Sequence, residues 1–102
     1  MPQTFNELFD PAPEAVGLRG DRPLWAAMRD RLRGVPLPDT AEEFNHVISE
    51  LFAELTGVPL GHPEPVFLPH YRGDAGGMSS GYVSPEFWRD RGLQLLWSRW
   101  RG

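Results

Sequence analysis

The sequence predicts a mainly α-helical domain of the α+β type, with a small three-helix core and a short β-ribbon or extended segment around a Gly/Ser-rich loop. Three segments, residues 21–33, 40–56 and 84–100, each combine a helix-start signal with apolar residues at helical spacing. Residues 65–83 instead join a short apolar run to a stretch of glycines and serines. The length of 102 residues suits one small domain, so residues 1–102 are expected to form a single unit.

Residues 1–20 are expected to form an extended N-terminal segment that contains one helical turn. Thr4 and Glu7 have the spacing of a capping box, in which the side chain of each residue accepts a hydrogen bond from the backbone N–H of the other. Prolines shortly after this turn would end it. The apolar residues that the turn would pack against the main body are Phe5, Leu8 and Phe9.

The helix predicted over residues 21–33 begins at Asp21, because aspartate accepts hydrogen bonds from the free N–H groups of a first helical turn. Pro23 falls in that turn, where its missing N–H costs little. Gly34 follows the last predicted residue and favours the helix end. The apolar stripe at helical spacing consists of Leu24, Trp25, Met28 and Leu32.

Residues 40–56 carry the clearest helix pattern in the chain. Thr40 and Glu43 have capping-box spacing at its start, while Gly57 and Pro59 follow its end. Acidic residues occupy the face opposite the apolar stripe and are enriched near the start, as the helix dipole favours. The stripe repeats at steps of three and four over Phe44, Val47, Ile48, Leu51, Phe52 and Leu55.

Residues 65–83 are expected to contain two short strands that flank the glycine-rich loop. The first is the apolar run Val66–Leu68, with an extension through Tyr71. Pro69 cannot donate a ladder hydrogen bond, so this strand is predicted to lie at a sheet edge or to be bulged. The second is Met78–Val83, which would complete a β-ribbon.

The last predicted helix starts at Ser84 as N-cap, with Pro85 at its first position. Gly92 inside it costs about 1 kcal/mol relative to alanine, which suggests close packing there, with the helix over residues 40–56 as the expected neighbour. A small domain has little interior for all the large aromatic residues of this helix, so we expect a partner to cover part of them. These residues are Phe87, Trp88, Trp97 and Trp100.

Charge and composition exclude several classes of function. The net charge of −4 argues against general affinity for nucleic acid, although every one of the 10 basic residues is arginine. Cysteine is absent, which excludes disulfides and thiolate metal sites. No long apolar run or secretory signal is visible, so we expect no membrane association and a cytoplasmic location. Residues 39–64 carry six acidic side chains and no arginine, whereas residues 17–34 have an excess of arginine over aspartate. This asymmetry is explained either by a charged partner or by pairing between two helices of the same fold.

The Gly/Ser-rich loop is the candidate ligand site. Glycines let a backbone approach a ligand closely, and the helix start after the loop offers free N–H groups that suit an anion. The alternative is a surface turn in which Arg72 and Asp74 pair locally and Ser84 only caps its helix. The candidate ligand-binding residues are Arg72, Asp74, Gly77, Ser79, Ser80 and Ser84.

The segment from Gly77 to Gly81 also matches the G-x-S-x-G pattern of serine hydrolases. That pattern requires a helix directly after the serine, whereas the predicted helix starts only at Ser84, and the chain is short for a hydrolase sheet. His62 and His70 follow no recognised ligand spacing. No catalytic residue, metal or cofactor is therefore predicted.

The favoured function is that of a small acidic, non-enzymatic protein-interaction module. A bacterial inhibitor of the immunity or antitoxin kind is one concrete form, and a subunit of a larger complex is another. Self-association through the last helix is a companion possibility, and a small-anion-binding or hydrolytic module at the Gly/Ser-rich loop is the alternative. Arginine and tryptophan are preferred anchors of protein interfaces. The predicted interface residues are Trp88, Arg91, Trp97, Trp100, Glu42, Glu43, Glu50 and Glu54.

Overall fold

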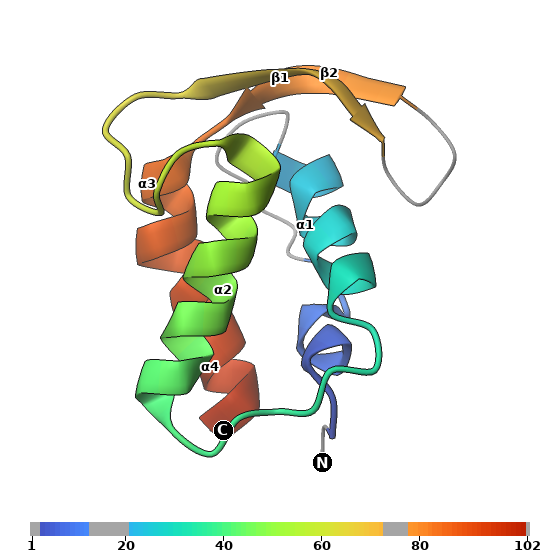
Figure 1. Ribbon diagram of the computed structural model, residues 1–102, viewed down its shortest axis with the longest axis vertical. Coiled ribbons are helices and arrows are strands. Elements are labelled where there is room, and N and C mark those ends of the chain that lie inside the picture. Colours follow the sequence, from blue (N-terminus) through green and yellow to red (C-terminus); the bar gives the residue numbers. More distant parts are fainter. Residues whose placement is uncertain (1–2, 13–20, 73–77, 102) are drawn as a thin grey trace.

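The computed structural model describes residues 3–12, 21–72 and 78–101, with side chains described at 3–12, 21–67 and 81–101. It contains α1 (Asp21–Arg31), α2 (Ala41–Thr56) and a final helix, together with a two-stranded antiparallel sheet of β1 (Val66–Arg72) and β2 (Met78–Val83) (Figure 1). This architecture confirms the predicted fold class of a small three-helix core with a short β-ribbon.

The final helix is continuous but changes its winding. It consists of α3 (Pro85–Phe87), one π-helical turn η2 (Trp88–Gly92) and α4 (Leu93–Arg101). A Cβ added at Gly92 would lie 3.2 Å from Cε3 of Trp88, so the close packing expected at this glycine is real. The three nearest atoms belong to Trp88 and Phe87 of the same helix, and none of them belongs to α2, the expected neighbour.

Replacing Gly92 with alanine is expected to lower the free energy of unfolding by about 1 kcal/mol, because crowding against Trp88 outweighs the helix preference of alanine. The Trp88 indole has little room to yield, since it is buried and donates a hydrogen bond to Asp21. Urea unfolding followed by circular dichroism measures the change, with the exposed Ser98→Ala on the same helix as control. A gain in stability for Gly92→Ala would contradict the crowding.

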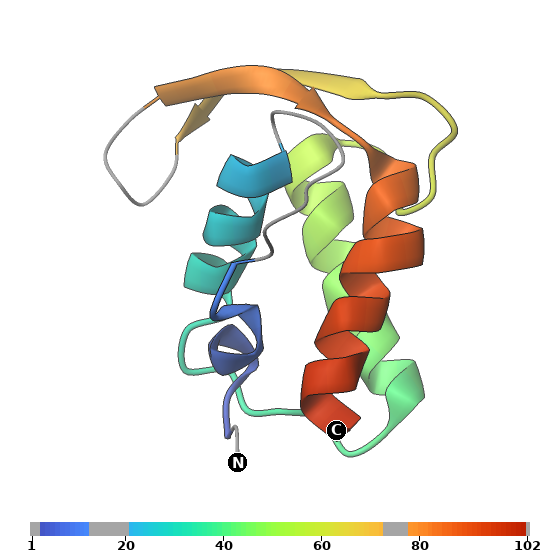
Figure 2. The ribbon, with the colours of Figure 1, turned by 180° about the vertical axis from the view of Figure 1, so that it is seen from behind.

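The helices form a small bundle beneath the β-ribbon (Figures 1 and 2). Helices α2 and α4 lie side by side and run in opposite directions, while α1 stands on the other side above the short 3₁₀ helix η1 (Phe5–Phe9) (Figures 1 and 2). The ribbon of β1 and β2 runs across one end of the helices, and both chain ends lie at the opposite end (Figure 1). The core therefore lies between α1, α2 and the final helix, and is closed from below by η1.

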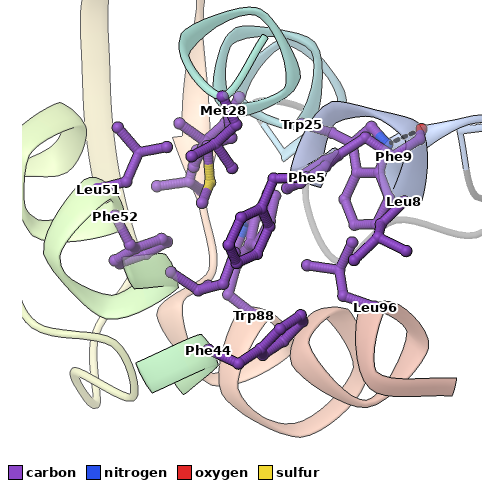
Figure 3. Packing of buried hydrophobic residues seen from close by; sticks show 14 residues of the cluster. Phe5, Leu8, Phe9, Trp25, Met28, Phe44, Leu51, Phe52, Trp88 and Leu96 are labelled. Atoms are coloured by element: carbon purple, nitrogen blue, oxygen red, sulfur yellow. Dashed lines mark hydrogen bonds between the residues drawn. The ribbon is translucent and has the colours of Figure 1, made fainter. Parts of the chain in front are cut away.

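Aromatic side chains from all these elements meet in the core (Figure 3). Phe5 of η1 lies 5.1 Å from Phe44 of α2 between ring centroids, and Phe9 lies 4.8 Å from Trp25 of α1. Nε1 of Trp25 donates a 2.7 Å hydrogen bond to the Phe9 carbonyl. Each fully buried large side chain contributes about 1.5–3 kcal/mol, so η1 is an integral part of the core, as its apolar residues predict.

The predicted helix caps are only partly present. Oγ1 of Thr40 accepts a 3.2 Å hydrogen bond from the Glu43 N–H, and Gly57 ends α2 with a left-handed φ of 81°. At η1 the capping box does not form: the Glu7 carboxylate accepts from the N–H of Gln3 at 2.8 Å, and the Thr4 side chain makes no cap hydrogen bond. In a capping box the Thr4 N–H would donate to the Glu7 carboxylate, whereas in this 3₁₀ turn the Gln3 N–H does so.

The ribbon is bulged at Pro69, as predicted. Its register shifts between Leu68 and Tyr71, which spans the proline that cannot donate to the ladder. Val66 pairs with Val83, which is buried against the helices. Next along the strands, Phe67 pairs with Tyr82, and these two side chains are 48% and 53% exposed on the outer face.

Candidate functional site

Only part of the predicted Gly/Ser-rich site lies within the described structure. Arg72 ends β1, and Ser79 and Ser80 lie within β2; the structure gives their backbone positions, with Ser79 opposite Tyr71 in the ladder. Asp74 and Gly77 lie outside the described residues. Grouping of these side chains around an anion therefore stays a prediction.

Ser84, the remaining residue of that site, already forms hydrogen bonds with other residues of the chain through its side chain and its backbone N–H. Its Oγ accepts a 3.2 Å hydrogen bond from the Phe87 N–H, which confirms its role as N-cap. Its own N–H donates a 3.0 Å hydrogen bond to Oδ1 of Asp21, which is 1% exposed. The anion next to this helix start is thus a carboxylate of the chain itself.

Asp21 is a residue whose role sequence reasoning missed. Its Oδ1 also accepts a 2.8 Å hydrogen bond from Nε1 of Trp88, so one buried oxygen joins the start of α1 to the final helix. The sequence signal was present only as an N-cap preference, because nothing local points to partners 63 and 67 residues away. This carboxylate holds the fold together and is not free to bind a ligand.

Neither a nucleophile elbow nor a metal centre is found in the described ranges. Ser79 lies inside strand β2, and the next helix begins only at Pro85, whereas an elbow turns from the serine directly into a helix. Within the parts of the chain that the structure describes, no three His, Asp or Glu side chains are grouped so that they could hold a metal ion.

A groove on the outer surface between α2 and α4 lies beside the predicted interface residue Trp97. Its volume is about 470 Å³, and Leu93 and Trp97 supply its apolar surface. Nε1 of Trp97 donates a 2.9 Å hydrogen bond to Oδ1 of Asn45, which fixes the indole at the groove edge. The full lining is Asn45, Leu93, Gln94, Trp97, Ser98 and Arg101.

The neighbouring Trp100 is held in a stack at the end of α4. The Trp100 ring lies nearly parallel to the Phe44 ring of α2, with 4.6 Å between the ring centroids. The guanidinium of Arg101 lies 4.2 Å from the centre of the Trp100 ring. Trp97 meets both rings edge-on, at 6.1 Å from Phe44 and 5.6 Å from Trp100. Both tryptophans are half-buried and belong to the predicted interface, so rigid aromatic surface is available next to the groove.

Trp88 departs from the predicted interface, because its exposed fraction is 0%. The interior accommodates it between Trp25, at 5.5 Å, and Phe52, at 5.9 Å between ring centroids. A residue without exposed surface cannot contact a partner, so Trp88 is removed from the candidate interface.

Arg91 is exposed and makes no hydrogen bond or ion pair with the other described residues. Its neighbour Asp90 is engaged by Arg89, whose Nε donates a 2.7 Å hydrogen bond that lowers the pKa of the Asp90 carboxyl. The same hydrogen bond raises the pKa of the Arg89 guanidinium. The charge of Arg91 also lowers the pKa of the Asp90 carboxyl, so Arg91 belongs to the same exposed cluster of charges as Arg89 and Asp90.

The acidic residues of α2 divide into two groups. Glu54 forms an ion pair with Arg31 of α1, and Glu50 accepts a 3.3 Å contact from Nε2 of His46. Glu42 and Glu43 form no ion pair with any residue in the described ranges. They line a second hollow, of about 270 Å³, together with Thr40 and His46. Pairing between α1 and α2 thus accounts for part of the charge asymmetry and leaves the first turn of α2 unneutralised.

No protein-family model, curated protein or solved structure matches this chain. Among the helices of the described ranges, not one combines the length and apolar character that a bilayer crossing requires.

Proposed function

We propose that this protein is a non-enzymatic interaction module that binds another protein through the α2–α4 face, defined as the groove residues Asn45, Leu93, Gln94, Trp97, Ser98 and Arg101 together with Glu42. The observation that carries the proposal is the groove itself: an apolar hollow beside a half-exposed tryptophan, with Arg101 in its lining. Protein interfaces share this arrangement of an aromatic and aliphatic centre inside a polar rim.

The rim charges define what the partner must present. Glu42 lines the second hollow and not the groove, but it lies three residues before Asn45, a spacing that makes the two side chains neighbours on the surface of α2. A partner needs an apolar side chain to fill the space next to Leu93 and Trp97, and a cation opposite Glu42. Buried apolar contact would supply most of the affinity, while the charge would set orientation and association rate.

Affinity capture with variant baits tests this proposal. The baits are the wild-type chain, Ser98→Lys, which places a long cation in the groove, and Glu42→Lys, which reverses the rim charge. Glu64→Lys is the matched control, because it changes the net charge as much as Glu42→Lys does but stands on an exposed loop. We expect proteins from a lysate of the source organism to bind the wild type and the control, and to bind the other two baits at least about tenfold more weakly. Equal capture by all four baits would overturn the proposal.

A further inference from the structure

We infer that the partner on the α2–α4 face is a second copy of this chain, related by a two-fold axis that runs parallel to the helices. This inference rests on the proposed function and names the occupant of the same face. It is carried by the position of two opposite charges, Glu42 on α2 and Arg101 on α4, relative to the groove between them.

The two charges lie at nearly the same height along the helices. The hydrogen bond between Trp97 and Asn45 sets these two residues level, and α2 and α4 run in opposite directions (Figure 1). Glu42 is three residues before Asn45 and Arg101 is four residues after Trp97. At 1.5 Å per residue they lie about 4.5 Å and about 6 Å from that level, toward the same end of the molecule.

Rotation by 180° about an axis parallel to the helices leaves the position of each residue along the helices unchanged. It exchanges the α2 side of the groove with the α4 side. It therefore places α2 of one copy against α4 of the other, with Glu42 opposite Arg101 of the second copy. Symmetry repeats the pairing, so two ion pairs flank a centre in which Leu93 and Trp97 of both copies meet. Such an interface is self-complementary, as closed dimers require.

The mixed signs of the rim favour a second copy over a uniformly charged partner. A surface that presented only cations would match Glu42 but would be repelled by Arg101, and an acidic surface would meet the reverse conflict. Neither residue forms an ion pair within the described part of its own chain, although the Arg101 guanidinium lies over the Trp100 ring, 4.2 Å from its centre. On α4 the face extends over the 9 residues from Leu93 to Arg101, about 13 Å, which corresponds to a small interface and a weak, concentration-dependent dimer.

Sedimentation of the purified full chain over a concentration series tests this inference. The wild type is expected to pass from a monomer of 11.5 kDa toward twice that mass as concentration rises. Glu42→Arg and Arg101→Glu are each expected to weaken self-association at least about tenfold, because each places like charges opposite one another. The combined Glu42→Arg, Arg101→Glu variant restores opposite charges and should restore the dimer.

Glu43→Arg is the matched control for Glu42→Arg. Glu43 lies in the same first turn of α2, so the two reversals disturb the helix dipole alike, but it lies about 160° around the helix from Asn45, whereas Glu42 lies about 60° from it. Circular dichroism of each variant verifies the fold. A wild type that stays monomeric throughout, or a combined variant no better than either single one, would overturn the inference. If a monomeric wild type still captures another protein, and the Glu42 and Ser98 variants do not, the proposed function stands and only the dimer is ruled out. If the wild type captures no protein either, both the dimer and the proposed function are ruled out.

Discussion

Replacing Trp88 with alanine is expected to lower the free energy of unfolding by about 3–5 kcal/mol, the largest effect of any single change proposed for this chain. The side chain is fully buried and fills the space between Trp25 and Phe52. Its removal would leave a cavity lined by aromatic rings and would also remove the indole N–H that binds Asp21. Urea unfolding followed by circular dichroism measures the loss.

Trp97→Ala is the matched control for this prediction. It removes the same side chain from the same helix, but at a position that is half-buried and beside the α2–α4 groove. It is expected to cost less than half as much, since less apolar area returns to water. Equal losses for the two variants would show that Trp88 is not the centre of the core.

The second helix could be predicted from sequence because all its signals are local. The Thr40 cap, the glycine that ends it and the apolar residues at helical spacing lie within one segment, and the structure places them as predicted. The same is true of η1, where Phe5 and Phe9 are buried, and of the β-ribbon, where Pro69 coincides with the bulge. Local propensity and periodicity are sufficient where the neighbours along the chain decide the conformation.

The final helix shows where that reasoning ends. Counting aromatic residues against the size of the domain indicated that some must be exposed, and Trp97 and Trp100 are indeed half-buried. The count of aromatic residues could not identify Trp88 as the fully buried one, because its burial depends on contacts with Trp25 and Phe52 from two other helices. The π-helical turn also escaped prediction, since no helix-start or helix-stop residue marks it in the sequence.

The candidate docking face was foreseen only as a set of residue types. The choice of tryptophan, arginine and glutamate as interface residues stays a prediction, and the groove itself exists only because Asn45 and Trp97, 52 residues apart, lie on adjoining helices. Spacing within one helix carries no information about that register. The height match of Glu42 and Arg101 likewise follows from the packed structure alone.

Replacing Asp21 with alanine is expected to lower the free energy of unfolding by about 2–4 kcal/mol, because it leaves two donors without their acceptor in a largely dry site. The Ser84 N–H and the Trp88 indole N–H both donate to the same carboxylate oxygen, at 3.0 Å and 2.8 Å. Asp21→Asn is the control, since the amide retains one acceptor oxygen at nearly the same position. It should cost less than half as much when unfolding is measured in urea.

A double-mutant cycle with Trp88→Phe separates this hydrogen bond from the packing of the ring. Phenylalanine keeps an aromatic ring in the core but has no N–H, so its cost in the wild type includes the lost bond to Asp21. In the Asp21→Ala background that bond is already absent, and the cost of Trp88→Phe should fall by about 1 kcal/mol or more. Additive losses, equal within about 0.5 kcal/mol, would mean that the bond between α1 and the final helix contributes nothing, and that packing alone joins them.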